Sequence, residues 1–136
     1  MSNNYWVVGA MFGGKDDVLD EFIKRGYWYC WDKNSNNIDV SPQVIAMQNL
    51  FLQIVEGDRI AVKKLLGQGA TEIEIRAIGI VKAKDEEEWR VYVDWLPLGE
   101  SFAKKIARRV DFKGAGSSIH GPYTNDNPWI RQIFCV

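Results

Sequence analysis

Residues 59–95 read RIAVKKLLGQGATEIEIRAIGIVKAKDEEEWRVYVDW, and this stretch predicts three consecutive strands. The first is expected from Arg59 to Leu66, and a glycine-bearing turn joins it to the second, from Thr71 to Val81. The third is expected from Trp89 to Trp95, after an acidic turn. Short strands joined by such turns indicate antiparallel pairing.

The middle strand changes character along its length. Ile73 and Ile75 alternate with charged residues, which is typical of a strand with one face in solvent. Residues 78–81 are apolar on both faces. We therefore expect a strand that leaves solvent and enters a closed barrel, with Gly79 allowing it to bend. In the third strand, one face is shared by Trp89, Val91, Val93 and Trp95.

The rest of the chain adds two strands and four short helices. Residues 5–10 form a short apolar run, which predicts a buried strand. Together the elements predict an α+β fold, a mainly antiparallel β-barrel with short inserted and flanking helices. The helices are expected at residues 16–25, from Ser41-Pro42 to near Leu50, at residues 102–110, and from Pro128 onward with Asp126 or Asn127 as its cap.

Length and composition fit one soluble domain that covers residues 1–136. Hydrophobic residues make up 46% of the chain, charged residues make up 26%, and the net charge is −1. No apolar run is long enough to span a membrane and no signal peptide is evident, so we expect a cytoplasmic protein. Cys30, Cys135 and a single histidine cannot form the usual zinc sites, and no glycine-rich phosphate motif is present. We therefore expect neither metal nor cofactor.

The sequence offers no catalytic constellation. His120 is the sole imidazole, and Ser117 and Ser118 lie beside it in the chain. Neighbours in a loop are poor evidence for a catalytic dyad, because geometry decides. A structural or hydrogen-bonding histidine is favoured over a catalytic one, and we expect the protein not to be an enzyme.

An aromatic segment at residues 27–31, YWYCW, predicts a strand that ends at a ligand pocket. Bulky aromatic residues such as Trp28 and Trp31, followed by a polar loop, are typical of a pocket wall, and Trp95 is a candidate for a second wall. Aromatic walls stack on flat bases. The candidates for reading the base edge are Asp32, Asn34, Asp94 and the loop that contains Ser118 and His120.

Four basic residues occupy the predicted helix at residues 102–110. Lys104 and Arg108, and likewise Lys105 and Arg109, are spaced i,i+4 and would form one stripe. Such a stripe could hold the phosphates of a nucleic acid. The alternative is an ordinary solvated helix face.

The ordered set of segments resembles EVE domains, which belong to the PUA-like superfamily with YTH and ASCH domains. The resemblance covers nearly the whole chain. It departs from the family pattern at residues 33–52, a longer and more helical insert, and at the loop 114–123. The segments that carry it are Tyr5–Val8, the Gly-Asp turn and strand Glu56–Val62, Ile78–Val81, Val91–Leu98, Pro122 and Trp129-Ile130.

The resemblance implies a modified-base reader without catalytic activity. EVE domains bind a flipped methylated or hydroxymethylated base in an aromatic cage, with DNA favoured over RNA here as the ligand. They often act as recognition modules of modification-dependent restriction systems, joined to a nuclease or an AAA+ motor in the same or a partner chain. The cage walls implied for this chain are Trp31 and Trp95, with Trp28 and Tyr123 as further candidates.

Two other functions stay open. The first is a small amidohydrolase similar to some ASCH relatives, for which Lys63, Thr71 and Glu74 are the candidate residues. The alternation around Glu74 predicts solvent exposure, which argues against this cluster. The second is a non-catalytic protein-interaction module that uses exposed aromatic residues as an interface.

Overall fold

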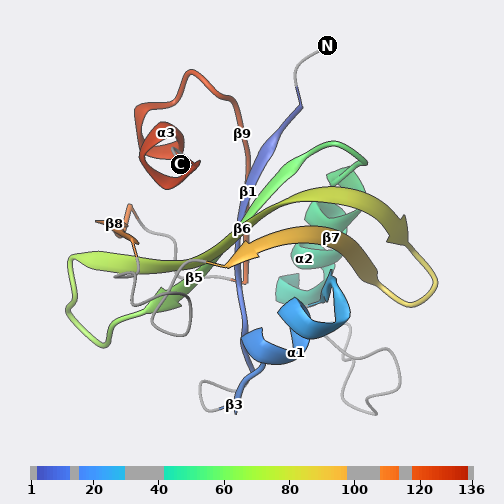
Figure 1. The fold of residues 1–136 in the computed structure, drawn as a ribbon, viewed down its shortest axis with the longest axis horizontal. Helices are drawn as coiled ribbons and strands as arrows, with labels where there is room; N and C mark the ends of the chain where they lie inside the picture. The colour runs from blue at the N-terminus through green and yellow to red at the C-terminus, as the bar shows by residue number, and fades with distance from the viewer. Residues whose placement is uncertain (1–2, 13–15, 30–41, 98–107, 114–117, 135–136) are drawn as a thin grey trace.

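A computed structural model describes residues 3–12, 16–29, 42–97, 108–113 and 118–134 of the chain (Figure 1). Helices and strands mix along the described chain, with three helices and nine strands. The elements are β1 (Tyr5–Gly9), β2 (Met11–Phe12), β3 (Asp16–Asp17), α1 (Leu19–Arg25), β4 (Tyr27–Trp28), α2 (Pro42–Gln53), β5 (Arg59–Leu65), β6 (Glu72–Asp85), β7 (Arg90–Pro97), β8 (Arg108–Asp111), β9 (Ile119–Tyr123) and α3 (Pro128–Phe134).

The long strand β6 lies in the middle of the main sheet (Figure 1). The sheet runs in the order β4-β7-β6-β5-β1-β9, with β8 paired to the first part of β6. β1 and β5 are parallel, and the other pairs of this sheet are antiparallel. The expected mainly antiparallel α+β fold is therefore confirmed. Since β4 and β9 end the path without pairing to each other, the described strands form an open sheet and not a closed barrel.

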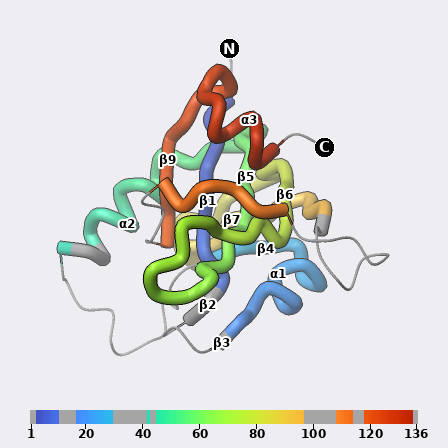
Figure 2. Tube along the Cα trace, turned by 90° about the vertical axis from the view of Figure 1, so that its left-hand side faces the viewer, coloured from blue at the N-terminus to red at the C-terminus, as the bar shows by residue number. Residues whose placement is uncertain are grey.

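Each face of the sheet carries its own hydrophobic core. Figure 2 shows α3 above the central strands and α1 below them. Helices α1 and α2 contribute to the first core, whereas α3 and β8 contribute to the second. Because β-strand side chains alternate between faces, neighbours in one strand are divided between the two cores. The first core includes Trp6, Val8, Phe22, Trp28, Phe51, Ile60, Val62, Val91 and Val93, and the second includes Val7, Ala61, Ile73, Ile75, Val110, Trp129, Ile130 and Ile133.

Gly79 is required by close packing and not by a bend. A Cβ atom at this position would lie 2.5 Å from Cγ1 of Val93, 2.6 Å from the carbonyl oxygen of Asp94 and 3.1 Å from Cε3 of Trp95. The irregularity in the β6–β7 register lies elsewhere, between Val81 and Ala83. The glycine therefore lets the Trp95 ring and the β7 backbone approach β6.

Gly79→Ala should lower the free energy of unfolding by about 1–3 kcal/mol, because the added methyl group overpacks a contact that includes backbone. Urea denaturation would measure the change. Gly9→Ala is the matched control, since a Cβ there meets its nearest atom at an ordinary 3.6 Å. Equal effects of the two substitutions would contradict the packing explanation.

The Gly-Asp turn is held by a buried carboxylate. Asp58 is fully buried, and its Oδ2 accepts hydrogen bonds from Trp6 Nε1 at 2.9 Å and from the Val55 amide at 3.0 Å. Its Oδ1 accepts from the Asn4 amide at 3.0 Å. One side chain therefore fixes β1 and the segment after α2 to the start of β5.

The prediction of a helix at residues 102–110 is wrong for residues 108–110, the part of it that the structure describes. Residues 108–111 form β8, which pairs with Glu72–Ile75 of β6. Val110 is buried in the second core between two exposed residues, as a strand requires. Pairing with β6 therefore overrides the local helical spacing.

Two boundaries of the predicted elements also differ. Asp16 and Asp17 form the short strand β3, so α1 starts only at Leu19. As predicted, Gly26 ends this helix, and its backbone is left-handed with φ 72°. The aromatic strand β4 contains only Tyr27 and Trp28 of the predicted residues 27–31; residues 30 and 31 lie outside the described chain.

The helix starts are largely confirmed. α2 begins at Pro42 and reaches Gln53. Asn127 caps α3, because its Oδ1 accepts a hydrogen bond from the Trp129 amide at 2.9 Å. Among the described helices, none has the length and hydrophobicity that crossing a membrane would take.

Candidate functional site

The predicted base-binding residues do not gather at one place. Within the described chain, Trp28 and Trp95 lie with the first core, whereas Asp94, His120 and Tyr123 lie on the face of the second. Trp31, Asn34, Lys104 and Lys105 lie outside the described residues. The described candidates therefore cannot all contact one base.

Trp28 is a core residue. Its side chain has no exposed surface, and its Nε1 donates a hydrogen bond to the Gly9 carbonyl oxygen at 2.9 Å. A base cannot stack on a ring that is already covered on both faces. The prediction that Trp28 is a cage wall is therefore wrong, because the ring packs between β1, α1 and β7.

Trp95 is half-buried and held in a fixed orientation. It packs against the first core, and its Nε1 donates a hydrogen bond to the Tyr27 carbonyl oxygen at 3.4 Å. The missing side chain at Gly79 makes room for the ring. Part of the indole stays accessible, so Trp95 can serve as a stacking surface.

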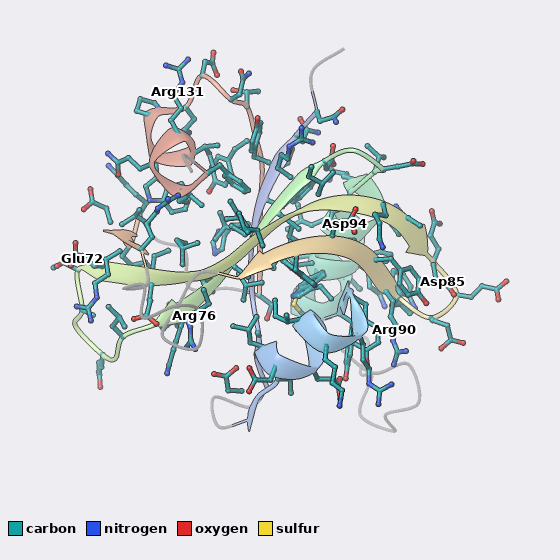
Figure 3. The ribbon with its side chains drawn as sticks, viewed as in Figure 1. Glu72, Arg76, Asp85, Arg90, Asp94 and Arg131 are labelled. Carbon is teal, nitrogen blue, oxygen red and sulfur yellow. The ribbon has the colours of Figure 1, made fainter. Side chains whose placement is uncertain are left out.

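Asp94 points away from the Trp95 ring. The two are neighbours in β7, so their side chains lie on opposite faces of the sheet. Figure 3 shows Asp94 on the side of β7 away from α1. Asp94 is exposed and forms an ion pair with Lys82 at 3.3 Å. Asp94 and Trp95 nevertheless both line one hollow of about 310 Å³, so the reading of a base by Asp94 beside Trp95 stays a prediction.

Tyr123 belongs to the surroundings of the second core. Its half-buried ring meets Trp129 edge to face, with centroids 5.4 Å apart. Burial raises the pKa of its hydroxyl. Tyr123 and Trp95 thus lie on opposite sides of the sheet and cannot form two walls of one cage.

The predicted basic stripe is not a helix face. Arg108 and Arg109 are neighbours in β8, so their side chains diverge. Arg108 donates a hydrogen bond to the Ile133 carbonyl oxygen at 2.6 Å, at the end of α3. Arg109 is exposed. Of these two arginines of the predicted stripe, only Arg109 is therefore directed at solvent.

Lys63 is one of two buried charged residues in the described chain. It lies on β5, beside Gly9 of β1, and only 5% of its surface is exposed. Its Nζ lies 3.6 Å from the position where a Cβ on Gly9 would stand. Burial lowers its pKa from 10.5 to about 8, so the amine is still mainly protonated at neutral pH.

Ser118 and His120 lie at the same end of the sheet as Lys63. The Ser118 carbonyl oxygen accepts a hydrogen bond from the Gly9 amide at 3.0 Å, and its Cα is 4.0 Å from the same Cβ position on Gly9. His120 pairs with Val7 and is half-buried. Burial, and secondly the charge of Lys63, lower the pKa of His120 below 6.5, so its imidazole is mainly neutral at pH 7.

The cluster predicted for an amidohydrolase does not assemble. Lys63 pairs with Ile75, whereas Glu74 pairs with the next residue, Lys64. Glu74 instead forms an ion pair with Arg76 at 3.4 Å. Thr71 is exposed, so the lysine, the carboxylate and the hydroxyl do not face one another.

Comparison with known proteins gives no family for this chain. No protein-family model matches it, and no curated protein is significantly similar to it in sequence. Within the described residues, no group of three or more histidine, cysteine, aspartate or glutamate side chains is placed to hold a metal ion. The function must therefore be argued from the geometry.

Proposed function

We propose that this chain is a modified-base reader of the PUA-like kind that EVE domains exemplify. It binds a flipped methylated or hydroxymethylated base, in DNA rather than RNA, and stacks that base on Trp95 without chemical turnover. In a restriction system it would supply recognition to a nuclease or an AAA+ motor. The observation that carries the proposal is the fixed, half-exposed indole of Trp95.

Two features of Trp95 support a stacking role. Its hydrogen bond to the Tyr27 carbonyl and its contact with Gly79 fix the ring before any ligand arrives. A fixed ring loses little side-chain entropy when a base stacks on it. A base on an aromatic platform contributes about 1–3 kcal/mol.

The position of Trp95 also supports the original pairing with Trp31. Trp95 donates a hydrogen bond to a backbone carbonyl of β4. Trp28 is the last residue of that strand, and Trp31 follows it three residues later in the sequence. The cage therefore requires Trp31 but none of the residues on the opposite face.

Trp95→Ala should weaken binding to a modified oligonucleotide by about 5- to 150-fold, which corresponds to the loss of one stacked base. Trp95→Phe should retain most of the affinity, since it keeps an aromatic face. Fluorescence anisotropy would measure both, using labelled DNA with cytosine, 5-methylcytosine, 5-hydroxymethylcytosine, adenine or N6-methyladenine, and matching RNA.

Glu72→Gln is the matched control, because it removes one exposed carboxylate at the start of β6, seven residues before Gly79, the residue that pairs with Trp95. It should leave the preference for the modified base intact. Wild-type protein that binds modified and unmodified DNA equally would contradict the reader function. Wild-type preference that survives Trp95→Ala would instead place the base elsewhere.

A second candidate function, protein interaction, is favoured by an apolar hollow that Trp95 and Asp94 also line. The hollow has a volume of about 310 Å³, and its lining includes Tyr5, Phe134 and the exposed side chains of Ile80 and Leu96. Exposed apolar side chains around a hollow are typical of contact surfaces. Concentration-dependent dimerisation in sedimentation velocity, without nucleic-acid binding, would favour this function.

A further inference from the structure

Lys63 is a buried cation without a polar partner. Within the described chain, its Nζ forms no hydrogen bond and no ion pair, although 95% of the residue surface is covered. Buried ammonium groups are normally paired, because leaving water without compensation is costly. The other buried charged residue in the described chain, Asp58, receives three hydrogen bonds.

The Lys63 side chain lies where several strands begin or end. Gly9 is the last residue of β1, Ser118 immediately precedes β9, and Lys63 is near the end of β5. The register pairs Lys63 directly with Gly9, whose lack of a side chain leaves space beside the ammonium group. The Lys63 ammonium group therefore lies at the end of the sheet, beside Gly9 and Ser118.

The charges around Lys63 favour an anion. His120, from β9, is the described titratable group that interacts with it electrostatically. On β6 the facing partner is the apolar Ile75, and on β1 it is Gly9. In the described chain no carboxylate offsets the lysine charge. A ligand that carries negative charge would provide that compensation, and at low dielectric the attraction is strong.

We propose that Lys63, with His120 beside it, forms a binding site for a phosphate group at the end of the sheet next to Ser118. The ammonium group donates hydrogen bonds to the phosphate oxygens, and the neutral imidazole of His120 adds a further donor. The site lies on the opposite face from Trp95, so it does not depend on base stacking. The phosphate comes either from a free ion or from a nucleic-acid strand, and the chemistry of recognition is the same.

Titration of the Lys63 side chain by NMR tests this site directly. The lysine CεH signals would be followed from about pH 6 to about pH 11 in chloride, with inorganic phosphate, and with short unmodified single-stranded DNA. Lys63 is expected to titrate at about 8 in chloride. Bound phosphate should raise that value by about one pH unit or more, because it stabilises the charged form.

Lys63→Met identifies the signal and should abolish the saturable phosphate-induced shifts at His120 and Ser118. Lys64→Met is the matched control, since Lys64 is the next residue in β5 and pairs with Glu74. It should leave the Lys63 response unchanged. A response to inorganic phosphate identifies a free ion as a ligand, and a response to DNA alone identifies a strand phosphate. No response to either, or equal phosphate shifts in Lys63→Met, would overturn the proposal without affecting the Trp95 prediction.

Discussion

Asp58→Ala is expected to lower the free energy of unfolding by about 3–5 kcal/mol, the largest loss for any single substitution considered for this fold. The substitution removes an acceptor and leaves three donors behind. These are the amides of Asn4 and Val55 and the indole Nε1 of Trp6. The Trp6 side chain is fully buried, so no water replaces its lost partner without opening the first core.

Asp85→Ala is a suitable control for Asp58→Ala. Asp85 also accepts hydrogen bonds from two amides, those of Glu87 and Glu88, but it lies in a partly exposed turn. Water can satisfy those amides, so we expect a loss below about 1 kcal/mol. Asp58→Asn should cost less than Asp58→Ala, because its amide oxygen can still accept from the Trp6 indole and the Val55 amide, whereas its amide nitrogen cannot accept from the Asn4 amide. Chemical denaturation of the variants would show whether burial causes the difference, and equal losses at Asp58 and Asp85 would contradict it.

The three central strands could be predicted because their signal is local. Ile73 and Ile75 alternate with charged residues, and the structure buries both isoleucines. Val91 and Val93 share a buried face in the same way. Turn glycines and strand alternation depend only on neighbours in sequence, so they are readable without knowledge of the fold.

The remaining pairings depend on contacts between distant segments. Residues 114–123 were expected to form a loop, yet residues 119–123 form β9, which contains Pro122 and pairs with β1 at the edge of the sheet. Proline is tolerated there, since an edge strand need not use every amide. The parallel pairing of β1 with β5 likewise has no local signature.

The candidate site shows the same division. The opposite facing of Asp94 and Trp95 follows from strand alternation alone and could have been deduced from the sequence. The burial of Trp28 could not, because it depends on Gly9 and α1. Lys63 follows Ala61 by two residues, so the sequence predicts that both side chains lie on the same face of the sheet. Its burial was not, since that requires β1 and β9 to cover it.

Lys63→Met should raise the free energy of unfolding at pH 7 by roughly 3 kcal/mol, and the melting temperature by roughly 10 °C. The reason is the difference between the lysine pKa of 10.5 in the unfolded chain and about 8 in the fold. Holding the proton on a buried amine costs this amount. Methionine has a similar length and requires no hydrogen bond, so it fills the same space without that cost.

The pH dependence distinguishes this explanation from improved packing. The unfolded chain binds the Lys63 proton more tightly than the fold does, so the wild-type protein gains stability relative to the variant as pH rises from about 8 to about 10.5. The advantage of Lys63→Met should therefore be complete below pH 8 and largely absent near pH 10.5. Lys64→Met, on the neighbouring half-buried lysine, should show no such trend.

An advantage that is constant with pH would indicate packing, and a destabilised Lys63→Met would mean that the amine already has a stabilising partner. If Lys63→Met is more stable and no longer binds phosphate, the Lys63 charge lowers the stability of the fold and is required for ligand binding.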